Sequence, residues 1–103
     1  MNPIKVTYSD EKLRVLVEEY ITMQKHEFVF KSLCSYVLYW AKEEGFTNED
    51  GLYESNQLSS NDCVRLSGVL EKLVRESRII ASGHNKKASD YFEDETRFIK
   101  VVE

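Results

Sequence analysis

The amino-acid sequence predicts an α+β fold with three main helices and a C-terminal β-hairpin. Apolar residues recur at the 3.6-residue period of an amphipathic helix within residues 9–24, 30–44 and 59–76. Two segments rich in β-branched residues, 78–82 and 96–102, follow and are separated by a polar stretch. The 103 residues contain no Pro- or Ser-rich linker and suit a single domain over residues 1–103.

Composition excludes several classes of protein. The chain is 42% hydrophobic and 12% aromatic, which is too rich for a disordered protein. Its apolar runs are far shorter than the roughly 20 residues that span a bilayer, and its start lacks a signal core, so we expect a cytoplasmic protein without a membrane partner. The net charge of −4 argues against a generally basic nucleic-acid coat.

The N-terminal segment combines a strand pattern with a helix start. Ile4, Val6 and Tyr8 alternate with polar residues, which is the period of a half-buried strand. Ser9 follows as the predicted N-cap, and two acidic residues come next, where the helix dipole favours them. We expect the first helix to extend to about Gln24.

The second helix is expected over residues 30–44, with Gly45 closing it. Its apolar residues cover about 200° of the helix, so it should contact helices on two sides. Residues 46–57 are polar and form either one short helix or a loop. The third helix begins with a capping-box-like pattern of Ser59 and Asp62 and extends to about Glu76.

The two C-terminal strands are expected to pair as a hairpin with an extended tip, because residues 84–95 between them are mostly polar. The N-terminal strand pattern is the candidate third member of this small antiparallel sheet.

Residues 69–79 read VLEKLVRESRI, and the polar segment from residue 47 leads into them. This pattern resembles the core of the winged helix-turn-helix superfamily, over about residues 30–102. It departs from the family at Ser77, where many members carry glycine. The resemblance implies a winged-helix protein that binds duplex DNA, as a transcriptional regulator or a DNA-associated accessory factor. It also implies frequent dimerisation, for which the first helix is the natural homodimer interface.

The face of the third helix opposite its apolar stripe carries the candidate DNA contacts. Residues 63–89 contain six cations and two acids, whereas the residues before Leu58 contain six cations and ten acids. Side chains near the start of a recognition helix meet base edges, and cations further along contact phosphates. The candidate base contacts are Ser59, Ser60, Asn61, Val64 and Arg65. The candidate phosphate contacts are Lys72, Arg75, His84, Lys86 and Lys87.

A protein-interaction module on the same fold is the alternative function, since cations opposite an apolar stripe are also typical of an ordinary solvated surface. Its partner protein would contact the first helix, the region of Tyr36 and Tyr39, or the acidic residues of 90–95, whose charge argues against DNA at the hairpin tip.

Neither an enzyme nor a cofactor or metal site is expected. The four glycines are isolated, and Cys34 and Cys63 lack the paired short spacing of zinc ligands. Cys63 lies in the first turn of a helix, where a thiol pKa falls, yet it projects towards the apolar face. We therefore expect both cysteines to be buried and inert.

Overall fold

The computed structural model describes residues 4, 6, 8–45, 58–82, 92 and 96–101 of the chain. The elements in these residues are α1 (Asp10–Met23), α2 (Phe30–Glu43), α3 (Ser60–Arg75), β1 (Ile79–Ser82) and β2 (Arg97–Lys100). Three helices followed by an antiparallel hairpin confirm the predicted α+β class and are consistent with a winged-helix-like arrangement. The predictions for residues 46–57, and for most of the polar stretch 84–95, fall outside the described residues.

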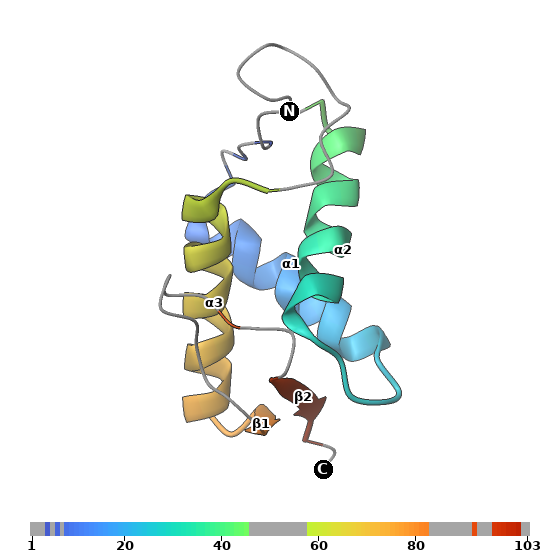
Figure 1. Cartoon of the computed structure of the whole chain (residues 1–103), viewed down its shortest axis with the longest axis vertical. Helices are drawn as coiled ribbons and strands as arrows, with labels where there is room; N and C mark the ends of the chain where they lie inside the picture. Colours follow the sequence, from blue (N-terminus) through green and yellow to red (C-terminus); the bar gives the residue numbers. More distant parts are fainter. Residues whose placement is uncertain are drawn as a thin grey trace.

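The three helices pack against one another around a common core. α2 and α3 lie alongside each other and run in opposite directions, while α1 crosses behind them (Figure 1). α2 contacts both other helices, as its wide apolar stripe predicts, and β1 packs against α3. Within the described ranges, none of the helices is both long and apolar enough to cross a membrane.

The buried face of each helix is the apolar stripe predicted from the sequence, because residues three and four positions apart share a face. The buried apolar helix residues are Leu13, Leu16, Val17, Tyr20 and Ile21 of α1, Phe30, Leu33, Val37, Leu38 and Ala41 of α2, and Leu66, Leu70 and Leu73 of α3. Five expected members of these stripes are less buried than predicted. Trp40 is exposed, and the half-buried ones are Cys34, Cys63, Val69 and Val74.

Phe98 of β2 closes the core from the hairpin side. It is fully buried, and its ring stacks on Phe28 at a centroid distance of 5.4 Å. Phe92 meets Phe98 edge-on at 4.9 Å, and the Phe92 N–H donates to Ser67 Oγ of α3 at 3.2 Å. Phe92 belongs to the mostly polar stretch between the strands, and it is buried in the core because burial of an aromatic ring is strongly favourable.

A residue between α1 and α2 extends the hairpin. β1 and β2 pair antiparallel with Ile80 opposite Ile99. Phe28 and Phe98 form an antiparallel bridge with N–H to O distances of 2.8 and 2.9 Å. The N-terminal segment, the candidate third strand, lies elsewhere: Ile4 forms a parallel bridge with Leu58.

The N-terminal segment, residues 4, 6 and 8, is attached to the start of α3. Its three side chains are buried, as the alternating pattern predicts. The hydrogen bonds join Ser59 N to Ile4 O (2.9 Å), Val6 N to Asp62 Oδ2 (3.0 Å) and Arg65 Nη2 to Tyr8 O. Burial raises the pKa of the Tyr8 phenol, and the nearby carboxylate of Glu44 raises it further. The segment pairs with α3 because polar groups one helical turn apart satisfy its buried backbone groups.

The helix ends follow the predicted signals. Ser9 and Ser59 cap α1 and α3, and each hydroxyl accepts the N–H of the residue three positions later. α3 ends in a Schellman motif, in which Arg78 N donates to Leu73 O at 2.9 Å. Ser77 in this motif has a φ of 60°, the left-handed conformation that glycine adopts most readily.

Candidate nucleic-acid interface

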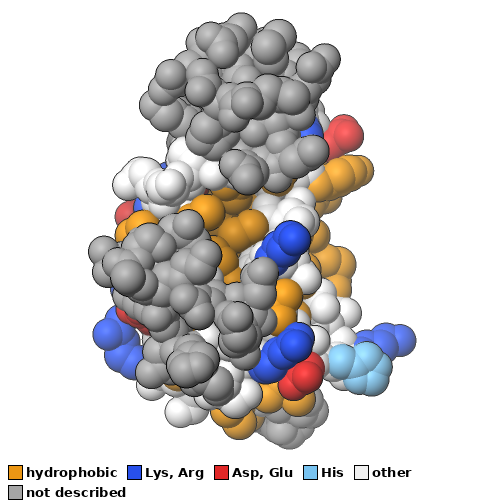
Figure 2. All heavy atoms as spheres, viewed as in Figure 1, with side chains coloured by type: hydrophobic (Ala, Val, Ile, Leu, Met, Phe, Trp, Pro, Cys, Tyr) orange, Lys and Arg blue, Asp and Glu red, His pale blue; other side chains and the backbone are white. Residues whose placement is uncertain are grey.

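The exposed face of α3 and the first half of α1 enclose a groove of about 310 Å³, which we call the α1–α3 groove. Its lining residues are Asp10, Arg14, Arg65, Gly68, Val69, Glu71, Lys72 and Arg75. The structure thus brings together Arg65, Lys72 and Arg75, three of the residues predicted to bind DNA. On the face drawn in Figure 2, Lys and Arg side chains stand in separate groups with hydrophobic side chains between them. The α1–α3 groove differs from that face because four cations line it: Arg14, Arg65, Lys72 and Arg75.

Arg65 is held by contacts within the chain. Its guanidinium pairs with Asp10 Oδ1 at 3.0 Å and with Asp62 Oδ1 at 3.3 Å, and it donates to Tyr8 O. Asp62 is only 2% exposed, and its other carboxylate oxygen accepts from the Ser59 hydroxyl at 2.7 Å. Arg65 therefore joins α1, α3 and the N-terminal segment, and it would have to leave these partners to reach a base.

Arg14 crosses from α1 to the end of α3. Its guanidinium donates two hydrogen bonds to the Glu76 carboxylate, at 2.6 and 3.1 Å, and one to Glu18 at 3.2 Å. The hydrogen bond from Arg14 holds the pKa of the Glu76 carboxyl below its usual value, because it stabilises the ionised form. The charge of Arg14 is thus balanced within the chain.

Lys72 and Arg75 are the groove cations that lack an ion pair within the described part of the chain, although Lys72 is near enough to Glu76 to help lower the pKa of that carboxyl. Both lie in the last turn of α3, and both are exposed. Neither forms an ion pair or a side-chain hydrogen bond with any residue that the structure describes. Either side chain could therefore reach an anion without leaving an ion pair with a described residue.

Gly68 lies in the middle of the same helix face. A Cβ atom placed there would have no atom within 4 Å, so packing inside the chain does not require a glycine. Glycine inside a helix costs about 1 kcal/mol relative to alanine. The chain therefore carries a destabilising residue, without a packing reason, in the lining of the α1–α3 groove.

The predicted base contacts at the start of α3 fall into two groups. Ser59 is buried, and its hydroxyl serves as the helix cap. Ser60 and Asn61 are exposed and Val64 is 39% exposed, so these side chains are accessible on the surface. The predicted contacts from the hairpin, His84, Lys86 and Lys87, lie outside the described residues.

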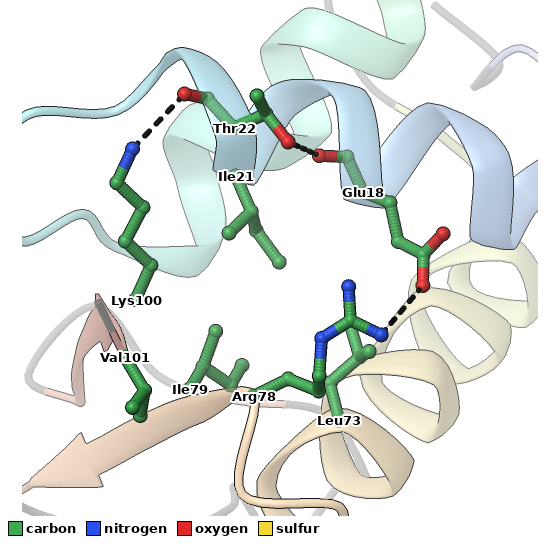
Figure 3. A pocket seen from close by; sticks show the side chains of 8 residues that line it. All are labelled: Glu18, Ile21, Thr22, Leu73, Arg78, Ile79, Lys100 and Val101. Carbon is green, nitrogen blue, oxygen red and sulfur yellow. Dashed lines mark hydrogen bonds and ion pairs between the residues drawn. The ribbon is translucent and has the colours of Figure 1, made fainter. Parts of the chain in front are cut away.

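A second pocket, of about 300 Å³, lies between α1, the end of α3 and the hairpin (Figure 3). Arg78 Nη1 is 3.5 Å from Glu18 Oε1, and Lys100 Nζ donates to Thr22 O at 3.0 Å. Lys100 thereby places a positive charge at the C-terminal end of α1, whose last turn has no basic residue. The cations of this pocket join the hairpin to α1, so the α1–α3 groove is the better candidate for binding an anion.

No known family model, curated protein or solved structure matches the chain, so homology assigns it no function. Among the described residues there is no group of three or more His, Cys, Asp or Glu side chains that could hold a metal ion. The chemistry that the geometry offers is recognition of an anion by exposed cations on a helix face.

Sequence reasoning missed the two residues that α1 contributes to the groove, Asp10 and Arg14. The spacing of Arg14 and Glu18 indicates a pair on one helix face. No local signal indicates that Glu76 is the second partner of Arg14, because that contact exists only when α1 packs across α3.

Proposed function

We propose that this chain is a winged-helix protein that binds duplex DNA through α3. In the complex α3 lies in the major groove, Lys72 and Arg75 contact phosphates, and Asn61 and Val64 face base edges. The observation that supports this most directly is the pair of exposed cations, Lys72 and Arg75, on the same helix face as a half-buried glycine with free space around it. A protein of this kind acts as a transcriptional regulator or as a DNA-associated accessory factor.

One feature besides the order of elements supports the winged-helix assignment. Ser77 has a φ of 60° at the position where many members of that superfamily carry glycine.

In this proposal Arg65 supports α3 and does not read bases. A base contact would break its ion pairs with Asp10 and Asp62. Sequence preference then depends on the side chains of α3 that are exposed and available, chiefly Asn61, whose amide can form two hydrogen bonds with adenine.

Counterion release gives the size of the expected salt effect. Two phosphate contacts predict a slope of about −1.8 in a plot of log affinity against log salt, which is roughly a tenfold loss between about 50 and 200 mM salt. Each cation that is removed should reduce the slope by about 1.

The proposal is tested by titrating the protein into a labelled duplex and following fluorescence anisotropy at two salt concentrations. Lys72→Gln/Arg75→Gln should bind weakly and lose most of the salt dependence. The matched control is Lys25→Gln/Lys31→Gln, which removes the same charge from exposed positions outside α3. Equal losses in both double variants, or no binding by the wild type at low salt, would refute the role of α3.

Gly68→Ala separates function from stability. Because the added Cβ meets no atom within 4 Å, the free energy of unfolding should rise by about 1 kcal/mol. The same methyl group would stand on the face that approaches DNA, so binding should weaken although the protein is more stable. Unchanged binding would show that DNA does not approach this helix closely.

A protein-interaction module is the second candidate, because α1 and α2 expose apolar surface. Val15 and Met23 of α1 and Tyr36 of α2 line a depression of about 460 Å³, together with Glu18 and Glu19. This surface includes the proposed homodimer interface on α1. Sedimentation of the wild type and of Met23→Lys tests it: a dimer that the variant abolishes supports self-association, and a monomer at every concentration rejects it.

A further inference from the structure

α1 carries a second apolar stripe besides the one that faces the core. Val15 and Met23 are exposed, and they lie about two turns apart on one side of the helix. Together with Tyr36 of α2, they line the depression of about 460 Å³ described above. The stripe covers roughly 12 Å of α1, since each residue adds about 1.5 Å. The depression thus has the shape that accepts one face of another helix.

The exposed side of α2 continues this surface with aromatic side chains. Tyr36 contacts Trp40 at a ring-centroid distance of 6.5 Å, and Trp40 contacts Tyr39 at 5.5 Å. Tyr39 and Trp40 are both exposed. Exposed apolar patches mark interaction sites, and Trp and Tyr contribute most often to the binding energy of protein interfaces. We call the exposed apolar residues of both helices the α1–α2 surface; they are Val15, Met23, Tyr36, Tyr39 and Trp40.

The charges around the α1–α2 surface are acidic. Glu18 and Glu19 line the depression, and no Lys or Arg among the described residues does so. Glu18 is paired with a neighbouring arginine, whereas Glu19 is exposed and forms no ion pair with any residue that the structure describes. Glu43 lies three positions after Trp40, so it shares the exposed face of α2. Lys12, a cation on the same side of α1, lies one turn before the stripe and outside the depression.

We propose that the α1–α2 surface binds an amphipathic helix of a partner protein. Apolar residues of that helix enter the depression, and its Lys or Arg side chains face Glu19 and Glu43. The inference rests on the second candidate function, the protein-interaction module, and names its class of partner. A helix fits because residues at i, i+3, i+4 and i+7 form an apolar stripe that a groove between helices accepts. Complementary charge then sets the specificity and the rate of association.

A second copy of the chain fits this surface less well. A dimer with two-fold symmetry brings the same patch of both subunits together. Glu18 and Glu19 of each copy would then face those of the other, and the described lining of the depression supplies no cation to offset the repulsion. A basic helix replaces this repulsion by attraction, so the charges favour it.

The single tryptophan of the chain reports on binding, because Trp40 belongs to the α1–α2 surface. The probe is a synthetic helical peptide of about 18 residues, roughly 27 Å long, with Leu on one face, Lys on the other and no aromatic residue. Titrating it into the full chain should shift the Trp40 emission to shorter wavelength until the shift saturates, since the peptide excludes water from the indole. A twin peptide with Glu in place of each Lys should bind at least about tenfold more weakly.

Two variants locate the binding site. Glu19→Lys should weaken binding of the basic peptide about three- to tenfold, because a repulsion replaces an attraction at an exposed position. Met23→Ser should weaken it at least about fivefold, because an apolar anchor is lost. The matched control is Glu27→Lys, which makes the same charge change at an exposed position outside the lining of the depression and should bind almost as tightly as the wild type.

Three results would overturn the proposal: no emission shift with the basic peptide, equal losses in Glu19→Lys and Glu27→Lys, or equal binding of the two peptides. Circular dichroism checks that the variants fold, and titration of the wild type needs no substitution.

The outcomes separate this inference from the functions proposed above. A wild-type dimer that Met23→Lys abolishes would overturn the basic helix as the occupant, because a second copy would then cover the surface, but it would support the interaction module. The titration contains no nucleic acid and leaves α3 unchanged, so its failure would leave the DNA-binding proposal untouched.

Discussion

Replacing Asp62 with alanine should strongly destabilise the fold, because this carboxylate joins the N-terminal segment to α3. Asp62 is 2% exposed. It accepts from Val6 N at 3.0 Å and from Ser59 Oγ at 2.7 Å, and it pairs with Arg65 at 3.3 Å. Alanine would leave a buried N–H and a partly buried guanidinium without their acceptor.

The size of the effect follows from these contacts. Breaking a buried ion pair costs about 3–5 kcal/mol, and an unsatisfied buried donor costs about 1–3 kcal/mol. The Arg65 side chain is 25% exposed and keeps Asp10 as a partner, so water and that carboxylate recover part of the loss. We therefore expect Asp62→Ala to lower the free energy of unfolding by about 3 kcal/mol, out of the roughly 5–15 kcal/mol typical of a domain.

Urea denaturation followed by far-ultraviolet circular dichroism measures this difference. Asp10→Ala is the matched control, because it removes the second carboxylate that pairs with Arg65. The Asp10 side chain is 89% exposed, so this change should lower the free energy of unfolding by less than about 1 kcal/mol. Asp62→Asn keeps a hydrogen-bond acceptor, so its free energy of unfolding should lie between those of Asp62→Ala and Asp10→Ala. If Asp62→Ala unfolds within about 1 kcal/mol of the wild type, the N-terminal segment does not depend on this carboxylate.

Three further changes probe other features. Ser77→Gly should stabilise the protein by about 0.5–1 kcal/mol in urea denaturation, because Ser77 has a φ of 60°; a loss of stability would contradict the Schellman geometry. Thr96→Val should be neutral or stabilising by up to about 1 kcal/mol in thermal melts, because the buried Thr96 hydroxyl has no hydrogen-bond partner among the described residues; a clear decrease in Tm would reveal such a partner. Arg14 lowers the pKa of Glu76 below 4.5, so the stability that this pair contributes is present above pH 4.5 and is lost as the pH falls through the folded-state pKa. Urea midpoints between pH 5.5 and 3 should therefore fall less steeply in Glu76→Gln than in the wild type, and identical pH profiles would contradict the pairing.

Local patterns predict the helices and strands of this chain well, because the period of apolar residues and the capping residues act within a few positions. They do not predict which segments of the chain pair with each other. The alternation of Ile4, Val6 and Tyr8 correctly indicates burial, but nothing nearby shows that the segment pairs beside Leu58. The Phe28 bridge is a single residue, so it has no period to detect.

The same limit applies to the candidate site. Helical spacing places Arg65, Lys72 and Arg75 on one face, and the structure brings them together in one groove. Spacing cannot show that Arg65 is held by Asp10, since the start of α1 covers it only in the folded chain.

The attachment of the N-terminal segment to α3 has a consequence for synthesis on the ribosome. Val6 precedes its acceptor Asp62 by 56 positions. At about 5–20 residues per second, the segment waits roughly 3–11 s for that acceptor to be made, whereas a helix forms in about a microsecond. During this interval the side chains of Ile4, Val6 and Tyr8 lack the surface that later buries them. The segment is thus made well before α3 but can take its final place only after the start of α3 has been made.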